Sequence, residues 1–124
     1  MQDFVSKKVM LIDDSITIRM SVSKLLSTEG YEVVLAEEGF DALAKIIEIK
    51  PDLIFLDLSM PNWSGFQVLS LLKMHENYRD IPVIILSGKD GISDRAKALS
   101  LGAIDFLLKP CTKEALSKVL QQCA

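Results

Sequence analysis

The sequence predicts an α/β protein in which five parallel strands alternate with five helices in a doubly wound sheet. Short, almost continuous apolar runs alternate along the chain with longer segments whose apolar residues recur at helical spacing. The runs contain few polar residues, which is typical of strands covered on both faces. Glycine and proline residues fall between these segments, where strands and helices have to end.

The composition fits one domain of ordinary size. The chain has 124 residues, 49% of them hydrophobic, which is enough for a sizeable core. The net charge of −3 and the interspersed charges argue against a nucleic-acid-binding surface. No segment approaches the roughly 20 apolar residues of a membrane span, and the N-terminus does not resemble a signal peptide. We therefore expect residues 1–124 to form one cytoplasmic domain that binds neither nucleic acid nor membrane.

The first half of the chain is predicted to alternate strand and helix, over residues 8–12, 15–29, 31–36, 40–49 and 53–56. The strands are apolar runs such as Val9-Met10-Leu11-Ile12. Gly30 ends the first helix, and Pro51 prevents the second from continuing. The second helix is expected to turn three apolar side chains inward, namely Leu43, Ile46 and Ile47.

The second half is predicted to continue the alternation, over residues 64–75, 83–86, 93–101, 103–107 and 112–122. Pro82 opens its strand, a position where proline is tolerated. Gly102 ends the fourth helix, and Thr112 caps the last one. The third helix has two possible apolar stripes, which are Phe66, Leu69 and Leu72 or Val68 and Leu71. Cys111 and Cys123 are too few for a disulfide framework, and on one helix they would lie roughly 18 Å apart, so we expect two thiols.

The polar residues that follow the strands predict where a ligand binds. Right-handed crossovers restrict the sheet to a doubly wound topology, and we expect the flavodoxin-like strand order 2-1-3-4-5. In such sheets ligands bind outside the carboxyl ends of the strands, where the order reverses. Asp13 and Asp14 follow the first strand, Asp57 follows the third, and Lys109 follows the fifth. Three acids and one amine should therefore meet at one edge, where they could hold a divalent cation and accept a phosphoryl group.

These strings resemble the response-regulator receiver domains of two-component signalling, and are most similar to the single-domain chemotaxis type. The matching strings are Ile12-Asp13-Asp14-Ser15, Leu56-Asp57-Leu58-Ser59-Met60-Pro61 with Gly65, Leu86-Ser87-Gly88 and Leu108-Lys109-Pro110. The match covers essentially the whole chain, and each string stands at the expected strand end. The stretch of residues 86–91 also looks like receivers of pilus-linked, chemotaxis-like pathways.

The resemblance implies that Asp57 accepts a phosphoryl group from a phosphohistidine on a sensor histidine kinase or a phosphotransfer protein. It implies that Mg²⁺ is held directly by Asp14 and Asp57 and by the backbone carbonyl of Ser59, with Asp13 acting through water. Without the metal, three crowded carboxylates should leave at least one with a raised pKa.

The resemblance also implies a switch. Lys109 and Ser87 are expected to bond the phosphoryl oxygens, and the Lys109–Pro110 bond is expected to be cis. As Ser87 moves toward the phosphate, Phe106 is expected to swing inward. The face of the fourth helix, fifth strand and fifth helix would then change shape and bind a downstream target protein. Phe106 stands where many relatives have tyrosine, so the hydroxyl is missing here.

The expected function is a switch that catalyses only its own phosphorylation and dephosphorylation. One alternative is a receiver cut from a larger response regulator or hybrid kinase. Another is a haloacid-dehalogenase-type aspartyl phosphatase, which needs a second aspartate where this chain has Ser59. More simply, Asp13 and Asp14 could be a helix cap with a first-turn acid. Trp63 could be a partner contact, a lid or a packed loop anchor, and His75 is expected to be a solvated surface residue.

Overall fold

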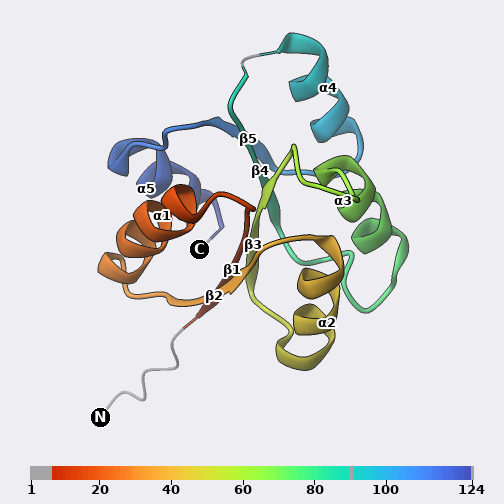
Figure 1. The fold of residues 1–124 in the computed structure, drawn as a ribbon, viewed down its shortest axis with the longest axis horizontal. Helices are drawn as coiled ribbons and strands as arrows, with labels where there is room; N and C mark the ends of the chain where they lie inside the picture. Colours follow the sequence, from red (N-terminus) through yellow and green to blue (C-terminus); the bar gives the residue numbers. More distant parts are fainter. Residues whose placement is uncertain (1–6, 90, 124) are drawn as a thin grey trace.

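The computed structural model describes residues 7–89 and 91–123, and it confirms the predicted alternation of strands and helices (Figure 1). The strands are β1 (Lys8–Ile12), β2 (Glu32–Ala36), β3 (Leu53–Asp57), β4 (Val83–Ser87) and β5 (Asp105–Leu108). The helices are α1 (Ile16–Thr28), α2 (Gly39–Ile49), α3 (Gly65–Met74), α4 (Ile92–Ser100) and α5 (Lys113–Gln122). The strands β3 and β4 each run one residue further than predicted, so Asp57 and Ser87 are the last residues of their strands.

The five strands form one parallel sheet in the order β2-β1-β3-β4-β5, as predicted. Helices α1 and α5 cover one face, and α2, α3 and α4 cover the other (Figure 1). The register aligns the carboxyl ends of the central strands: Ile12 pairs with Leu56, Asp57 with Leu86, and Ser87 with Leu108. The residues at or just beyond these ends therefore share one edge of the sheet.

The core has two layers, one on each face of the sheet. Met10 and Ile12 of β1 point into the layer under α2, α3 and α4, while Val9 and Leu11 point into the layer under α1 and α5. All four side chains are fully buried, because successive residues of a strand face opposite sides and both sides are covered. The central strands thus form a rigid base for the residues at their ends.

Two predicted helix faces need correction. Ile47 is 67% exposed, and α2 instead buries Ala42 and Ile46, with Leu43 partly buried. Neither stripe suggested for α3 is right as a whole: Leu71 is 41% exposed and Phe66 is only partly buried. The buried residues of α3 are Gly65, Val68, Leu69 and Leu72. The buried residues of α2 are three and four positions apart, and those of α3 are three, one and three positions apart. The angle at which each helix lies on the sheet decides which of its apolar residues these are.

The structure also bears on the two cysteines and on membrane-spanning helices. Cys111 and Cys123 are free thiols, as predicted, although Cys111 precedes α5 rather than lying on it. Burial raises the pKa of both thiols. Within the described ranges, no helix has both the length and the apolar character needed to cross a membrane.

Candidate functional site

The loop after β1 holds one buried and one exposed carboxylate. Asp13 is fully buried and Asp14 is exposed. Asp13 Oδ1 accepts a hydrogen bond of 2.9 Å from the Ser15 amide, and Ser15 Oγ caps α1 by accepting one of 3.4 Å from the Ile18 amide. The cap of α1 is therefore Ser15, and the acidic pair is not explained as a cap with a first-turn acid. Arg19, which the sequence reasoning did not single out, donates to the Asp13 carbonyl at 2.7 Å and fixes this loop.

Asp57 is the last residue of β3, and the backbone at the start of α3 packs directly against it. It is 2% exposed, and its Oδ1 accepts a hydrogen bond of 3.3 Å from the Ser59 amide. The Gly65 amide donates to the Leu58 carbonyl at 2.8 Å and so brings the start of α3 against the end of β3. A Cβ at Gly65 would collide with the Asp57 carbonyl oxygen and lie 2.8 Å from Leu58 Cα. Only glycine allows this approach, which holds Asp57 in place.

Lys109 reaches between the two buried carboxylates. Its Nζ donates to Asp57 Oδ1 at 2.8 Å and forms an ion pair of 2.7 Å with Asp13 Oδ2. The backbone amide of Lys109 donates to the Ser87 carbonyl at 2.8 Å, and the Lys109–Pro110 bond is cis, as expected. Burial alone would lower the pKa of this amine, but the two carboxylates outweigh burial and raise it. Lys109 is therefore a cation held at the bottom of the site.

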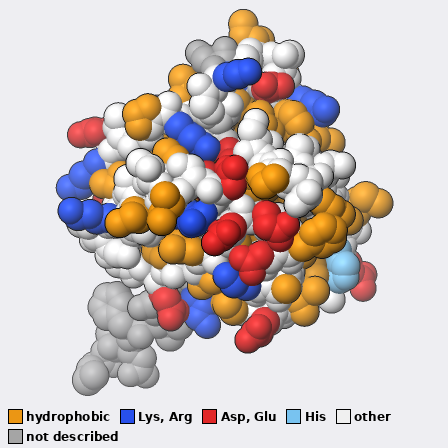
Figure 2. Space-filling view, viewed as in Figure 1, with side chains coloured by type: hydrophobic (Ala, Val, Ile, Leu, Met, Phe, Trp, Pro, Cys, Tyr) orange, Lys and Arg blue, Asp and Glu red, His pale blue; other side chains and the backbone are white. Residues whose placement is uncertain are grey.

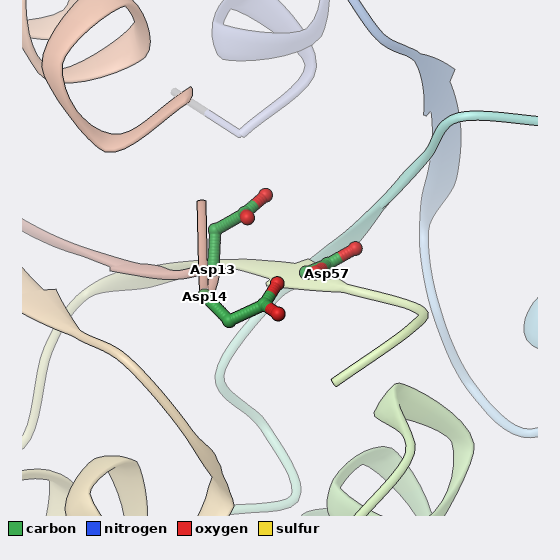
Figure 3. A group of neighbouring side chains, drawn as sticks. All are labelled: Asp13, Asp14 and Asp57. Atoms are coloured by element: carbon green, nitrogen blue, oxygen red, sulfur yellow. The ribbon is translucent and has the colours of Figure 1, made fainter. Parts of the chain in front are cut away.

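The three carboxylates are close enough to share one cation. Asp13, Asp14 and Asp57 each offer an oxygen, and these oxygens all lie within 4.8 Å of one another (Figure 3). Burial, together with the charge of Asp13, raises the pKa of Asp57 from 3.8 to about 6, although Lys109 acts in the opposite direction. One of the three acids therefore has a raised pKa, as predicted, but burial is the largest cause and the crowding of the carboxylates contributes less.

The donor set fits a hard divalent cation. It consists of carboxylate oxygens, which Mg²⁺ prefers, and it contains no thiol or imidazole. Asp13 Oδ2 is buried and forms the 2.7 Å ion pair with Lys109 Nζ, and among the described residues no other group donates to it. A buried carboxylate oxygen can accept more than one hydrogen bond, and a metal-bound water would supply a further donor here.

These groups open into a cavity of about 390 Å³ at the carboxyl edge of the sheet. Its lining includes five of the predicted residues, namely Asp14, Asp57, Ser59, Ser87 and Lys109. Asp13 lies behind Lys109, and Phe106 is not part of the lining. On the molecular surface, acidic side chains gather near the centre of the face shown in Figure 2, with lysine and arginine side chains beside them. The cavity is lined by both carboxylates and amines.

Sequence reasoning missed one charged residue of this lining. Asp94, in the first turn of α4, faces the same cavity. An acid in the first turn of a helix is common, because it interacts favourably with the helix dipole. The sequence signal was therefore present, but it did not distinguish a carboxylate that faces the cavity from one that faces solvent.

Ser87 and Phe106 are found in defined positions. The Ser87 hydroxyl donates to the Lys89 carbonyl at 2.9 Å and accepts from the Lys89 amide at 3.1 Å. Phe106 is 1% exposed, and the Arg95 guanidinium lies 5.1 Å from its ring centre. The expected inward swing of Phe106 stays a prediction. In this structure the ring already lies inside the protein. It belongs to the core under α2, α3 and α4, where a ring without a hydroxyl packs well.

Trp63 and His75 are also placed. Trp63 is half-buried against Gly39, and its ring centre lies 5.1 Å from that of Phe40, which fits a packed loop anchor; its role as a partner contact or a lid stays a prediction. His75 is exposed, as expected, and its ring lies against that of Tyr78.

Comparison with known proteins gives a consistent result. The family profile described as the response regulator receiver domain matches residues 9–121. The chain is 47% identical over 109 residues to Protein PilG of Pseudomonas aeruginosa, covering 88% of this chain and 81% of that protein. It is 36% identical over 112 residues to the response regulator MprA of Mycobacterium bovis, covering 90% of this chain and 48% of that protein. The chain thus spans about half the length of MprA.

Solved structures agree with this. The chemotaxis protein CheY4 of Vibrio cholerae superposes with a TM-score of 0.90 at 35% identity, covering 97% of this chain and 100% of that one. The receiver domain of the sensor histidine kinase PA1611 from Pseudomonas aeruginosa superposes with a TM-score of 0.86 at 26% identity, covering 95% and 97%. That structure has a magnesium ion coordinated in its active-site cleft.

Proposed function

We propose, because the chain belongs to the response regulator receiver domain family, that Asp57 is the phosphoacceptor of a two-component signalling switch. One observation carries the proposal: Asp57 is a buried carboxylate whose pKa is raised, with an amine at 2.8 Å and a cavity in front of it. A surface acid in a loop would have none of these features. The fixed position of Asp57 suits a nucleophile that must be held in line with a donor.

Mg²⁺ would be held directly by Asp14 and Asp57 and by the Ser59 carbonyl, with Asp13 acting through water. The proximity of the three carboxylates supports this set, as does the buried Asp13 Oδ2, which among the described residues is contacted by Lys109 Nζ and by no other donor. Bound there, the metal would neutralise the charge of the carboxylates and of the phosphoryl oxygens. Because Asp14 is the exposed member, it is also the one through which the ion would enter.

The phosphoryl step follows from the positions of the side chains. An Asp57 oxygen attacks the phosphorus of a phosphohistidine, the phosphorus–nitrogen bond breaks, and the electron pair leaves with the imidazole. Lys109, already beside Asp57, is placed to pair with a phosphoryl oxygen. Ser87 would exchange its bonds with Lys89 for a bond to another phosphoryl oxygen. The donor class we infer is a sensor histidine kinase or a phosphotransfer protein.

The output face would be formed by α4, β5 and α5. Four apolar side chains on or near α4 and β5 are at least 40% exposed, namely Ile92, Leu99, Ile104 and Leu108. Exposed apolar side chains without a basic surface favour a protein contact over a nucleic-acid contact. We infer a protein target in the cytoplasm, and no chemistry beyond the phosphorylation and dephosphorylation of Asp57.

Phosphorylation with acetyl phosphate and Mg²⁺ tests the assignment. Asp57→Asn should abolish the label, because the nucleophilic oxygen is replaced by an amide. Asp52→Asn is the matched control, since Asp52 is an exposed acid just before β3 and its carboxylate accepts from the Lys8 amide. Label that persists in Asp57→Asn, or disappears in Asp52→Asn, would contradict the proposal.

Metal binding can be measured separately through the fluorescence of Trp63, which packs in the loop after Asp57. Titration with Mg²⁺ should change the signal of the wild-type protein, and Asp14→Asn should weaken the response at least about tenfold, because one charged ligand is lost. An unchanged titration in Asp14→Asn would rule out direct ligation by this residue.

A further inference from the structure

We propose that Asp94 positions the water that hydrolyses the phosphorylated Asp57, and so sets the lifetime of the signal. The inference rests on the proposed function, because it concerns the same cavity. Asp94 is half-buried and lines the cavity together with Asp57, but it comes from α4, on the far side of the loop after β4. Among the described residues of the lining, it is the carboxylate that the proposed chemistry leaves without a role.

The direction of attack on the phosphoryl group decides which residues matter. Water attacks phosphorus in line with the bond that breaks, and therefore on the side away from the Asp57 oxygen. Asp57 is almost fully buried at the end of β3, so the attacking water has to arrive from the open part of the cavity. Besides Asp14, Asp57, Ser87 and Lys109, the polar side chains that line the cavity among the described residues are Ser59, Lys89 and Asp94.

The chemistry of these side chains selects Asp94. A lysine ammonium only donates hydrogen bonds, so Lys89 can hold a phosphoryl oxygen but cannot accept a proton from water. Ser59 can accept weakly, but its hydroxyl carries no charge. Asp14 and Asp57 are assigned to the metal and the phosphoryl group. A carboxylate accepts strongly, which leaves Asp94 as the group that can orient the water.

The local backbone holds this carboxylate near the cavity rather than along the helix. Asp94 is the third residue of α4, and its Oδ2 lies 3.4 Å from the point where a Cβ would stand on Gly91, the residue before the helix. The side chain is therefore folded back over the start of the helix, toward the loop that contains Gly88 and Lys89. Those two residues belong to the same cavity lining.

The proposed step balances as follows. The water oxygen forms a bond to phosphorus, and the bond between phosphorus and the Asp57 oxygen breaks. The electron pair of that bond returns to Asp57 as a carboxylate. One proton of the water passes to Asp94 and then to solvent, and inorganic phosphate leaves. Because the transition state is loose, orientation of the water by Asp94 contributes more than removal of its proton.

The test compares phosphate lifetimes. The purified protein is phosphorylated with acetyl phosphate and Mg²⁺, the excess donor is removed, and the phosphorylated fraction is followed on a phosphate-affinity gel. Asp94→Asn keeps the shape of the side chain and should slow the decay about tenfold, at the low end of the range for general base catalysis. The decay is followed only after the donor has been removed, so the measured lifetime does not depend on how fast each variant was phosphorylated.

Glu114→Gln is the matched control. Glu114 is also an acid in the first turn of a helix, α5, but it is exposed and outside the cavity lining. If Asp94 only stabilised its helix, both variants would melt at lower temperature and both would keep the wild-type lifetime, which would overturn the proposal. A faster decay in Asp94→Asn would overturn it too. If Asp94→Asn does not fold, Asp94→Ala takes its place with the same expected slowing.

The two proposals fail in different ways. A wild-type protein that takes no label from acetyl phosphate would contradict the assignment of Asp57 as phosphoacceptor. A protein that is labelled on Asp57 but decays at the same rate with and without the Asp94 carboxylate would contradict only the role of Asp94.

Discussion

Helices α3 and α4 both follow a strand that carries a site residue, but they are attached to the protein very differently. At the start of α3, Ser64 Oγ accepts from the Gln67 amide at 3.3 Å and Gln67 Oε1 accepts from the Ser64 amide at 2.8 Å. This helix buries four of its residues. At the start of α4 stands Gly91, which has no side chain to cap with, and α4, every residue of which is described, buries only Ala98.

The difference between α3 and α4 assigns them two roles: one segment holds the nucleophile, and the other can move when the site changes. The segment that follows Asp57 is clamped to the sheet, so the nucleophile keeps its position while charge builds up on it. The segment that follows Ser87 has few buried contacts, and a small free-energy change suffices to displace it. A switch needs both properties in one cavity, because a site that moved as a whole could not position the phosphoryl group.

The largest expected effect comes from the clamped side. Gly65→Ala should lower the free energy of unfolding by about 1 to 3 kcal/mol or more, because its Cβ would be forced against the backbone of Asp57 and Leu58. Gly88→Ala, in the loop before α4, should change it by less than about 0.5 kcal/mol, since nothing lies within 4 Å of its Cβ position. Urea denaturation of the two variants measures this. Equal losses would remove the contrast between the two segments.

A smaller effect should come from the charge of the nucleophile. Asp57 has a pKa of about 6 in the folded protein against an ordinary value of 3.8, so its ionisation destabilises the fold as pH rises through this window. Without Mg²⁺, Asp57→Asn should therefore be more stable than wild type by about 1 to 2 kcal/mol at pH 7.5. The difference should vanish below about pH 4, where both forms of the protein hold a neutral side chain.

Denaturation curves in chelator at several pH values check this prediction. Addition of Mg²⁺ should stabilise the wild type more than Asp57→Asn, because the metal binds the folded carboxylate. If Asp57→Asn were less stable than wild type at every pH, the ionised Asp57 carboxylate would stabilise the fold, and the prediction would be wrong.

The smallest expected effects concern the two helix starts. Ser64→Ala should lower the free energy of unfolding by about 1 kcal/mol, because the capping of α3 is lost. Gly91→Ser should raise it by only a few tenths of a kcal/mol, by adding a cap to α4. Hydrogen exchange would locate both effects, with slower exchange in the α4 amides of Gly91→Ser. A large loss of stability in Gly91→Ser would contradict the picture of a weakly held helix.

The sequence predicted the fold and the centre of the site well for a physical reason. Buried parallel strands are continuous apolar runs, and the residues after them share one edge, so Asp13, Asp57 and Lys109 had to converge once the strand order was chosen. These inferences need only local pattern and topology.

What the sequence did not predict depends on how elements are rotated and how loops close. Ile47 is exposed because of the angle at which α2 lies on the sheet. The spacing of the apolar residues in the sequence does not reveal this angle. The orientation of Asp94 depends on the loop before α4, and the contact of Arg95 with Phe106 joins α4 to β5. Such contacts involve pairs of elements, and no single stretch of sequence encodes them.

The two hydrogen bonds between the Ser87 hydroxyl and the backbone of Lys89 affect how the site responds to free phosphate. An inorganic phosphate ion that drifts into the cavity meets a hydroxyl whose donor and acceptor are both occupied, and it must compete from its dilute concentration in solution. A phosphoryl group tethered to Asp57 competes at a far higher effective concentration. Ser87 should therefore keep its hydrogen bonds to Lys89 when free phosphate is present, and exchange them for a phosphoryl oxygen when Asp57 is phosphorylated.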